Sequence, residues 1–326
     1  MNNKYKKIRW GIIGLGNIAE KFAEDMQAVD SGLLYAVGSR NSSKARNFAE
    51  KHHVQKAYDS YAGLLKDENI DAVYIATPHS LHKENALACL KNKKAVLCEK
   101  PLAMNEAEVK EMIYMAKSNN VLLMEAMWTY FLPHYRYVLE LLDRNEFGKL
   151  KKLEADFGFK SEFDKKSRLF DKKLGGGSLL DIGIYPVFAA LSVLGVPDKI
   201  DATAHFLDNN IDTQCQIKFT YPDQVIAQLK STVIENTPTT ATFYCEHGII
   251  KINKNFYGPT TVSILSGTDS QTVDFGYHTK GYTYEIEHFN RLLIDGKKES
   301  PVMSHDFSLR LIKTLDQIRD QIGLKY

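Results

Sequence analysis

Short apolar runs alternate with amphipathic stretches through the first 125 residues of the chain. The runs are rich in β-branched residues and cover residues 8–13, 33–37, 72–76, 95–98 and 121–124. Strands that are apolar on both faces are typical of a parallel sheet that is covered on both sides. Helical patterns lie between the runs, at residues 17–29, 44–52, 81–91 and 106–118. This alternation predicts a doubly wound parallel sheet of the α/β class.

After Trp128 the pattern changes to strands with little helix between them. A helical stretch at 133–145 and a strand at 150–159 precede three consecutive glycines, and further strand patterns cover residues 202–207, 213–220, 225–233, 240–245, 248–253 and 260–265. Successive strands without crossover helices predict an α+β domain on an open, mainly antiparallel sheet. Two helices, at 283–295 and 304–322, end the chain. We therefore predict two domains, 1–125 and 126–326, with helix 304–322 able to pack back on the first.

Composition and charge narrow the classes of function. Of 326 residues, 44% are hydrophobic and 25% charged, and the net charge of +2 lacks the basic excess of a nucleic-acid-binding protein. The four cysteines are far apart, so we expect reduced core thiols rather than a disulfide framework. The apolar run after the basic N-terminus is too short for a signal peptide, and we expect no membrane-spanning stretch. These features predict a cytoplasmic protein without nucleic-acid or membrane partners.

The sequence GLGNIA, at residues 14–19, lies between the first predicted strand and the first helix. Gly14 suits a tight turn, Gly16 lets a pyrophosphate approach the backbone, and the small Ala19 lets helix and strand pack closely. Free N–H groups at the start of the helix favour phosphate binding. The pattern predicts a dinucleotide site of the Rossmann type, the alternative being an ordinary turn. Its expected members are Gly14, Gly16, Asn17, Ile18 and Ala19.

The end of the second strand selects the nucleotide. NAD sites usually carry Asp or Glu there to bind the ribose 2′-OH. This chain instead has Ser39, Arg40 and Asn41, with Lys44 just beyond. A guanidinium can bind a 2′-phosphate through two hydrogen bonds and stack on adenine. Ser39, Arg40 and Lys44 therefore favour NADP; in the alternative these are solvated charges and NAD is also accepted.

Thr77, Pro78 and His79 follow the third of the long apolar runs. Ligands meet a doubly wound sheet at the carboxyl ends of its strands, so all three are candidate cofactor contacts. His79 or His82 is also a candidate contact for the ribose or the substrate. The alternative is that each histidine merely precedes the next helix.

Two segments carry candidate catalytic groups. Glu99 and Lys100 follow the fourth apolar run, which would place an ammonium at the ligand edge of the sheet; the alternative is a surface lysine. Asp181 and Tyr185 share one face if their segment is helical, because they are four residues apart. A carboxylate this deep in an apolar segment requires a partner or a function. Pro186 indicates that the helix begins only shortly before it.

The motifs GLGNIA, CEKPLA, MEAMWTYF and GGGSLLDIGIYPV occur in this order and spacing. Together they resemble the Gfo/Idh/MocA oxidoreductase family. MEAMW and DIGIYP resemble more narrowly the branch that contains dimeric dihydrodiol dehydrogenase and NADP-dependent D-xylose dehydrogenase. The resemblance spans the chain, with its most specific motifs between Gly14 and Pro186. Many family members have His where this chain has Tyr185.

The resemblance implies hydride transfer between NADP(H) and a CH–OH group of a sugar, polyol or trans-dihydrodiol. It makes Lys100 and Tyr185 the catalytic pair, oriented by Asp181, and adds Glu99 and Lys100 to the cofactor site. Free tyrosine and lysine have pKa values of about 10, too high for a base at neutral pH. An adjacent ammonium favours tyrosinate, so the pair can take up a hydroxyl proton, with Tyr185 favoured as the group that carries it.

Other residues are weaker candidates. Trp128 and Arg168 are expected, with Tyr185, to line the substrate pocket; the alternatives are an interface core residue for Trp128 and a surface charge for Arg168. The charged run 160–173 is either a lid or a solvated loop. No metal is expected, since Glu285 and His288, although spaced for one, are expected on an exposed helix face.

Two expectations concern partners and class. An antiparallel sheet with an uncovered face requires a partner, and the family likeness implies a second subunit, so we expect a homodimer or a higher homo-oligomer. The competing function is a non-catalytic NADP-binding sensor on the same fold. Such a sensor would have no use for the Lys100 and Tyr185 pair.

Overall fold

The computed structural model describes residues 7–164 and 167–326, which form two compact units. The first unit comprises Met1–Phe131 and His278–Leu309, and the second comprises Leu132–Tyr277 and Arg310–Tyr326. The division therefore differs from a single boundary at residue 125, because a late segment of the chain returns to the first unit. It also passes through the last helix, α9 (His305–Ile322).

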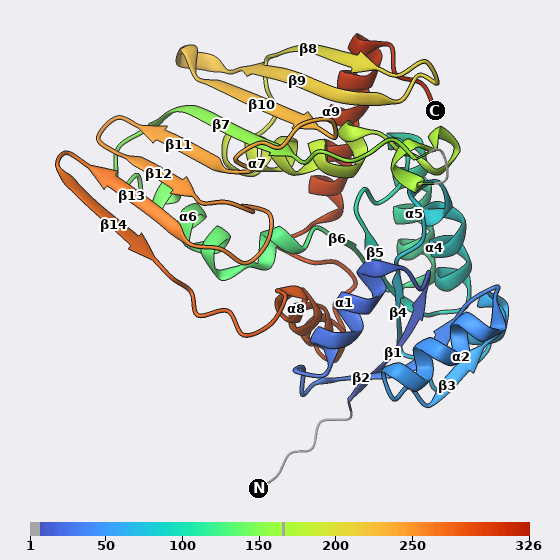
Figure 1. Ribbon diagram of the computed structural model, residues 1–326. Coiled ribbons are helices and arrows are strands. Elements are labelled where there is room, and N and C mark those ends of the chain that lie inside the picture. The colour runs from blue at the N-terminus through green and yellow to red at the C-terminus, as the bar shows by residue number, and fades with distance from the viewer. Residues whose placement is uncertain (1–6, 165–166) are drawn as a thin grey trace, which may run out of the picture. The chain divides into compact units, whose positions relative to one another are not determined.

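The first unit contains a six-stranded parallel sheet in the order β3-β2-β1-β4-β5-β6 (Figure 1). The strands are β1 (Ile8–Ile13), β2 (Gly32–Gly38), β3 (Lys56–Tyr58), β4 (Ala72–Ile75), β5 (Ala95–Glu99) and β6 (Leu123–Ala126). The helices are α1 (Asn17–Met26), α2 (Ser42–Lys51), α3 (Tyr61–Leu65), α4 (His82–Lys91) and α5 (Glu106–Asn119), with the 3₁₀ turns η1 (His79–Leu81) and η2 (Trp128–Phe131). The predicted doubly wound sheet is confirmed. Only β3 and α3 were not predicted, because each is too short to show a period.

The late segment joins this unit through α8 (Tyr282–Ile294). The buried carboxylate of Asp25, on α1, accepts the backbone N–H of Lys280 at 3.0 Å and of Tyr282 at 2.8 Å. It thus satisfies N–H groups that the start of a helix leaves without partners. The indole N–H of Trp10 donates to Asn290 at 2.9 Å inside the core. Sequence periodicity cannot predict such contacts, which explains the difference in boundary.

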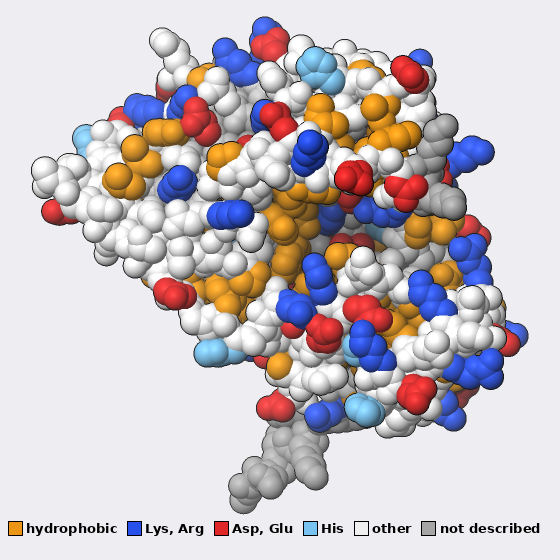
Figure 2. All heavy atoms as spheres, viewed as in Figure 1, with side chains coloured by type: hydrophobic (Ala, Val, Ile, Leu, Met, Phe, Trp, Pro, Cys, Tyr) orange, Lys and Arg blue, Asp and Glu red, His pale blue; other side chains and the backbone are white. Residues whose placement is uncertain are grey.

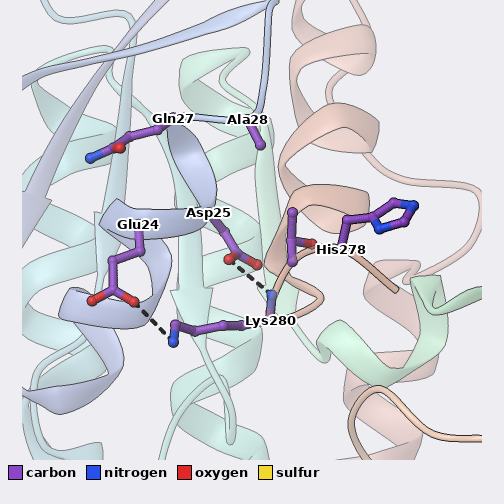
Figure 3. Close-up of a pocket in the computed structure, with 7 residues that line it drawn as sticks. Glu24, Asp25, Gln27, Ala28, His278 and Lys280 are labelled. Carbon is purple, nitrogen blue, oxygen red and sulfur yellow. Dashed lines mark hydrogen bonds and ion pairs between the residues drawn. The ribbon is translucent and has the colours of Figure 1, made fainter. Parts of the chain in front are cut away.

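A hollow of about 420 Å³ lies beside this junction, lined by the end of α1 and the loop before α8. Figure 3 shows the residues that line it. Glu24 and Lys280 form an ion pair of 3.0 Å across it. Asp25, which also lines the hollow, is paired with the backbone before α8.

The second unit contains an eight-stranded sheet in the order β14-β13-β12-β11-β7-β10-β9-β8 (Figure 1). The strands are β7 (Leu150–Gly158), β8 (Lys199–Phe206), β9 (Asp212–Thr220), β10 (Ile226–Thr232), β11 (Ala241–Cys245), β12 (Ile249–Ile252), β13 (Val262–Ser266) and β14 (Asp269–Val273). Only the β7–β10 pairing is parallel, so the predicted mainly antiparallel sheet is confirmed. Strand β14 was not predicted, because its residues are polar and mostly exposed.

One face of this sheet is covered by α6 (Pro133–Asp143) and α7 (Ile184–Leu194). A broad hollow of about 1080 Å³ lies against the sheet and is lined by polar side chains of neighbouring strands, among them Glu154, Gln216, Lys230, Thr242 and Lys251. The sheet therefore has a wide polar surface, and Gln321 of α9 also lines its hollow.

A π-helical turn, Leu179–Gly183, leads directly into α7. Pro186 falls in the first turn of α7, which agrees with the prediction that the α-helix begins only shortly before this residue. The segment Lys172–Leu194 has a window of mean hydropathy 1.7, which corrects the expectation that no stretch is apolar enough to cross a membrane. Because 78% of that window is buried inside the structure, a core helix accounts for it equally well.

Charges of both signs are interspersed over the face drawn in Figure 2. This agrees with the small net charge of +2. The basic N-terminal sequence falls largely in residues 1–6, which lie outside the described residues.

Candidate active site

The glycine loop after β1 has the geometry that a dinucleotide requires. Gly14 has a φ of +86°, and a Cβ on it would lie 2.5–2.6 Å from the backbone of Ala76 and Thr77. Only glycine is therefore accommodated there. A Cβ on Gly16 would meet nothing within 4 Å, so the loop is open on that side. Gly16 is also the N-cap of α1 and makes no side-chain cap, which leaves the N–H groups of the helix start available to a phosphate.

The other predicted loop members behave as the motif requires. Ala19 is a fully buried residue of α1, whereas Asn17 and Ile18 are exposed. The fit of the loop to a dinucleotide therefore rests on one tight turn, one open glycine and one small packed residue.

The turn after β2 carries no carboxylate. The Oγ of Ser39 accepts the N–H of Asn41 at 3.1 Å, and the side chain of Asn41 caps α2 by accepting the N–H of Lys44 at 3.0 Å. These two hydrogen bonds fix the turn. Arg40 and Lys44 project from it as exposed cations. The turn can therefore offer positive charge, but no acceptor from Asp or Glu, to a nucleotide ribose.

The turn after β4 is held from inside by His82. Thr77 and His79 are buried, and the hydroxyl of Thr77 accepts a hydrogen bond of 3.1 Å from the amide of Asn85. The two ring nitrogens of the fully buried His82 each lie 2.8 Å from a backbone carbonyl, of Thr77 and of Pro101. Because this ring faces the backbone of its own unit, the structural alternative is favoured for His82 over a ligand contact.

The turn after β5 carries Glu99 and Lys100. The hydroxyl of Tyr74 donates a hydrogen bond to Glu99, and burial raises the pKa of Tyr74 well above its usual value. The other carboxylate oxygen of Glu99 accepts the backbone N–H of Lys100 at 3.3 Å. Glu99 is thus held by a buried tyrosine on one side and by the turn itself on the other, at the edge of the sheet where a ligand would bind.

Sequence reasoning missed Glu125, which supports the same turn. It is buried on β6 and accepts the N–H of Leu102 at 2.9 Å. Burial raises its pKa to about 7. The sequence does contain a signal for Glu125, because a single acid inside an apolar run is expected to make a structural or functional contact.

Trp128 begins η2 and stacks on Tyr282 of α8, with ring centroids 4.5 Å apart and 13° between the planes. The ring is therefore held flat by a partner within the first unit. Its predicted role as a wall of the substrate pocket stays a prediction.

In the second unit, the three glycines 175–177 allow the chain to pass close to a buried carboxyl group. Gly177 has a φ of +117°, and a Cβ on it would lie 2.0 Å from Oδ1 of Asp212. The Oδ2 of Asp212 accepts the N–H of Leu179 at 2.6 Å and the hydroxyl of Ser178 at 3.0 Å. Burial raises the pKa of Asp212 to about 7. This residue fixes the start of the helical segment, and nothing in the polar loop before β9 could have predicted it.

Asp181 and Arg168 form an ion pair of 2.8 Å within the second unit. The expectation that an acid in this apolar segment has a partner is thus confirmed for Asp181. Asp181 lies in the π-helical turn rather than in an α-helix, so the assumed α-helical spacing to Tyr185 does not apply. The predicted substrate contact of Arg168 stays a prediction.

Tyr185 lies among aromatic rings of its own unit. Its centroid is 5.7 Å from that of Phe157 and 5.2 Å from that of Tyr257, and these two rings stack on each other at 4.2 Å. Tyr185 is buried. The arrangement places a phenol next to a flat apolar wall, and Phe157 and Tyr257 were not predicted from the sequence.

Two expectations about other residues need correction or remain untested. Glu285 is fully buried and not on an exposed helix face; burial raises its pKa well above the usual value, and neither carboxylate oxygen has a hydrogen-bond partner in the described part of the chain. His288 lies 2.8 Å from the hydroxyl of Ser300. Within residues 7–164 and 167–326 there is no group of three or more His, Cys, Asp or Glu suited to a metal ion. Of the candidate lid 160–173, residues 165–166 lie outside the described residues.

Comparisons with known proteins cover both units. Residues 8–127 match the family model "Oxidoreductase family, NAD-binding Rossmann fold", and residues 135–251 match "GFO/IDH/MocA C-terminal domain". A trans-1,2-dihydrobenzene-1,2-diol dehydrogenase of Xenopus tropicalis is 37% identical over 331 residues, covering 98% of this chain and 99% of the relative.

Two solved structures show the same fold. A 3-ketoreductase of Actinomadura kijaniata, in complex with NADP and TDP-benzene, has a TM-score of 0.88 and 26% identity and covers 97% of this chain and 98% of its own. An aldose-aldose oxidoreductase of Caulobacter crescentus has a TM-score of 0.89 and covers 98% of each chain, and at 22% identity it supports the fold alone. The resemblance of the motifs is confirmed: the chain belongs to the Gfo/Idh/MocA family of oxidoreductases.

Proposed function

We propose that the chain is an NADP-dependent dehydrogenase that acts on a CH–OH group of a small cyclic, polyhydroxylated substrate, a sugar or a trans-dihydrodiol. The observation that carries this proposal is the setting of Tyr185. A buried phenol lies beside the stacked rings of Phe157 and Tyr257 and follows the Asp181–Arg168 ion pair along the chain. A flat ring substrate can pack on such a wall and present a hydroxyl to the phenol. The relative named as a trans-dihydrodiol dehydrogenase and the solved 3-ketoreductase support the same class.

The preference for NADP rests on the turn after β2. Arg40 and Lys44 are exposed there, and no Asp or Glu is present to bind a ribose 2′-OH. The Actinomadura 3-ketoreductase was solved with NADP. NAD remains a possible second nucleotide, because no side chain of this turn excludes it.

The proposed chemistry divides the work between two residues. Bound NADP supplies the hydride acceptor at its nicotinamide ring. Tyr185 takes the hydroxyl proton of the substrate, and the ammonium of Lys100 favours the tyrosinate form that can do so. Asp181, held by Arg168, positions the helical turn that precedes Tyr185. Structures have also been solved for variants of the 3-ketoreductase in which a lysine is replaced by Ala or Glu, or a tyrosine by Phe. Lysine and tyrosine are the two residue types of the proposed pair.

The assembly and location belong to the same proposal. The polar sheet surface of the second unit, with its hollow of about 1080 Å³, is wide enough to suit a second copy of the chain. We expect a cytoplasmic homodimer or higher homo-oligomer, to be measured by sedimentation with and without NADP.

The testing experiment follows absorbance at 340 nm while NADP⁺ or NAD⁺ is titrated with D-xylose, D-glucose and a trans-dihydrodiol. Reduction of NADP⁺ with one of these substrates, and weaker reduction of NAD⁺, is the expected result. Tight NADP⁺ binding without turnover on any diol or sugar would contradict the dehydrogenase and favour the sensor.

A further inference from the structure

His82 makes an unusual pair of contacts for a buried histidine. Its Nδ1 lies 2.8 Å from the carbonyl oxygen of Pro101, and its Nε2 lies 2.8 Å from the carbonyl oxygen of Thr77. The side chain has no exposed surface. The two carbonyls belong to the turns that follow β5 and β4, so one imidazole joins two neighbouring turns at the ligand edge of the sheet.

The chemistry of these acceptors constrains the protons on the ring. A backbone carbonyl can accept a hydrogen bond but cannot donate one. A neutral imidazole has one donor and one acceptor nitrogen, so one of its nitrogens would face a carbonyl lone pair at 2.8 Å. Only the imidazolium donates from both nitrogens. Both contacts are hydrogen bonds only in that form.

A second buried histidine shows the contrasting case. In the second unit, Nε2 of His134 lies 3.0 Å from the carbonyl oxygen of Phe256, but its Nδ1 lies 2.6 Å from the hydroxyl of Tyr277. That hydroxyl can donate, so a neutral ring satisfies both contacts. Burial lowers the pKa of His134 to about 4, which agrees with a neutral ring. In His82, by contrast, both ring nitrogens face backbone carbonyl oxygens.

We propose that His82 is held as an imidazolium and, by donating to Thr77 and Pro101, acts as a positioning residue that fixes the turn carrying Lys100 against the nucleotide-facing turn after β4. Supporting contacts reinforce both turns. Asn85, one helical turn further along α4, donates to the hydroxyl of Thr77 at 3.1 Å. Glu125 accepts the N–H of Leu102, the residue after Pro101, at 2.9 Å. We call these two turns, joined by His82, the His82 clip.

The clip has a direct consequence for Lys100. Lys100 immediately precedes Pro101, so the carbonyl held by His82 is one residue away from the backbone that carries the proposed catalytic ammonium. Loss of the clip would let the two turns move apart, and a displacement of about 1 Å at a reacting group can cost about 100-fold in rate. This kinetic consequence rests on the proposed function, whereas the protonation state of His82 does not.

The protonation state is measured directly on the full-length protein without substrate. Long-range ¹H–¹⁵N correlation spectra of ¹⁵N-labelled protein at pH 7 distinguish an imidazolium from either neutral tautomer. The His82→Gln spectrum assigns the signal, and His247→Gln, at an exposed histidine of the second unit, is the matched control. We expect two protonated ring nitrogens for His82. One unprotonated ring nitrogen would overturn the proposal, and this result does not depend on any enzymatic activity.

The positioning role is measured by comparing His82→Leu with His82→Gln, which retains amide donors. Turnover is expressed per NADPH-binding site, so that unfolded protein does not count. We expect kcat per site to fall by about 10- to 100-fold in His82→Leu and by less in His82→Gln, with the Kd for NADPH within about threefold. Wild-type kcat per site in His82→Leu would overturn the positioning role. If the wild-type protein shows no turnover, the proposed function fails, while the spectra still decide the state of His82.

Discussion

Two turns that carry proposed catalytic residues are held by buried ionisable side chains of opposite kinds. In the first unit, His82 faces the carbonyl oxygens of Thr77 and Pro101. In the second, Asp212 accepts the N–H of Leu179 and the hydroxyl of Ser178. The difference follows from the backbone. Turns at the carboxyl ends of strands present carbonyls that need donors, whereas the start of a helical segment presents N–H groups that need acceptors.

The comparison also explains why the glycines differ between the two places. Gly14 avoids the backbone of Ala76 and Thr77, which belong to the adjacent strand end. Gly177 avoids the side chain of Asp212 itself. Gly14 thus leaves room for the backbone of a neighbouring turn. Gly177 leaves room for the carboxyl group of Asp212, which holds the start of the helical segment.

The largest expected effect tests the proposed catalytic pair, Lys100 and Tyr185. Lys100→Met and Tyr185→Phe should each lower kcat by about 10²- to 10⁴-fold, because each removes proton transfer or the charge that favours it. The Kd for NADPH should change by less than about threefold in Tyr185→Phe. Stopped-flow turnover and fluorescence titration measure the two quantities.

The matched control is Tyr114→Phe, at a tyrosine on α5 that is 72% exposed. It should leave kcat and Kd at wild-type values. Wild-type turnover in both Lys100→Met and Tyr185→Phe would contradict the assignment of the pair.

The next effect tests how tightly Asp212 constrains the glycine cluster. Gly177→Ala should lower the free energy of unfolding by about 3 kcal/mol or more, because the new Cβ would lie 2.0 Å from Oδ1 of Asp212 and the φ of +117° is strained for alanine. Gly267→Ala is the control, since its φ of +59° is also left-handed but nothing lies within 4 Å. Denaturant unfolding measures both. Equal losses in the two variants would mean that Asp212 contributes nothing beyond backbone strain.

A third prediction concerns nucleotide selectivity, measured as the Kd for NADP⁺ and for NAD⁺. Arg40→Ser should raise the Kd for NADP⁺ by about 10- to 100-fold and leave the Kd for NAD⁺ nearly unchanged, because only the 2′-phosphate loses a charged hydrogen-bond donor. Arg46→Ser, at an exposed arginine of α2, is the control. Isothermal titration measures the four constants. A parallel loss for both nucleotides would show that Arg40 does not select between them.

The prediction of a nucleotide site rests on local patterns, because Gly14 and Arg40 each lie just after a predicted strand. His82 and Asp212 act on carbonyl and N–H groups 19 and 33 residues away in the chain, which no periodicity records. The misplacement of Glu285 on an exposed face has the same origin. Its helix is buried by contacts such as Trp10 with Asn290, 280 residues apart.

A fourth test separates the charge of Asp212 from its shape. Its pKa is raised by burial from the usual 3.8 to about 7, so the folded protein binds this proton more tightly than the unfolded chain. The resulting stabilisation is complete below about pH 4 and is lost as the pH rises through about 7. Asp212→Asn cannot titrate. The stability of the wild-type protein relative to Asp212→Asn should therefore fall by on the order of 4 kcal/mol between pH 4 and 7.5, at about 1.4 kcal/mol per unit of the pKa difference.

Urea unfolding at several pH values measures this difference. Glu125, whose pKa burial also raises to about 7, titrates in both proteins and so cancels. Parallel stability curves for the two proteins would contradict a raised pKa for Asp212.

The smallest expected effect compares two hydrogen bonds that support the turns held by His82 and Asp212. Asn85 donates to the hydroxyl of Thr77 at 3.1 Å, and Ser231 lies 3.1 Å from the hydroxyl of Ser178. Asn85→Ala and Ser231→Ala should each cost about 1 kcal/mol of unfolding free energy, since each removes one buried, uncharged hydrogen bond. If His82 and Asp212 act independently, Asn85→Ala should change only the Kd for NADPH, and Ser231→Ala should change only kcat. Each change should be less than about threefold. Because the residues share no partner, the double variant should show the sum of the two losses, and a larger loss would mean that the two turns are energetically coupled.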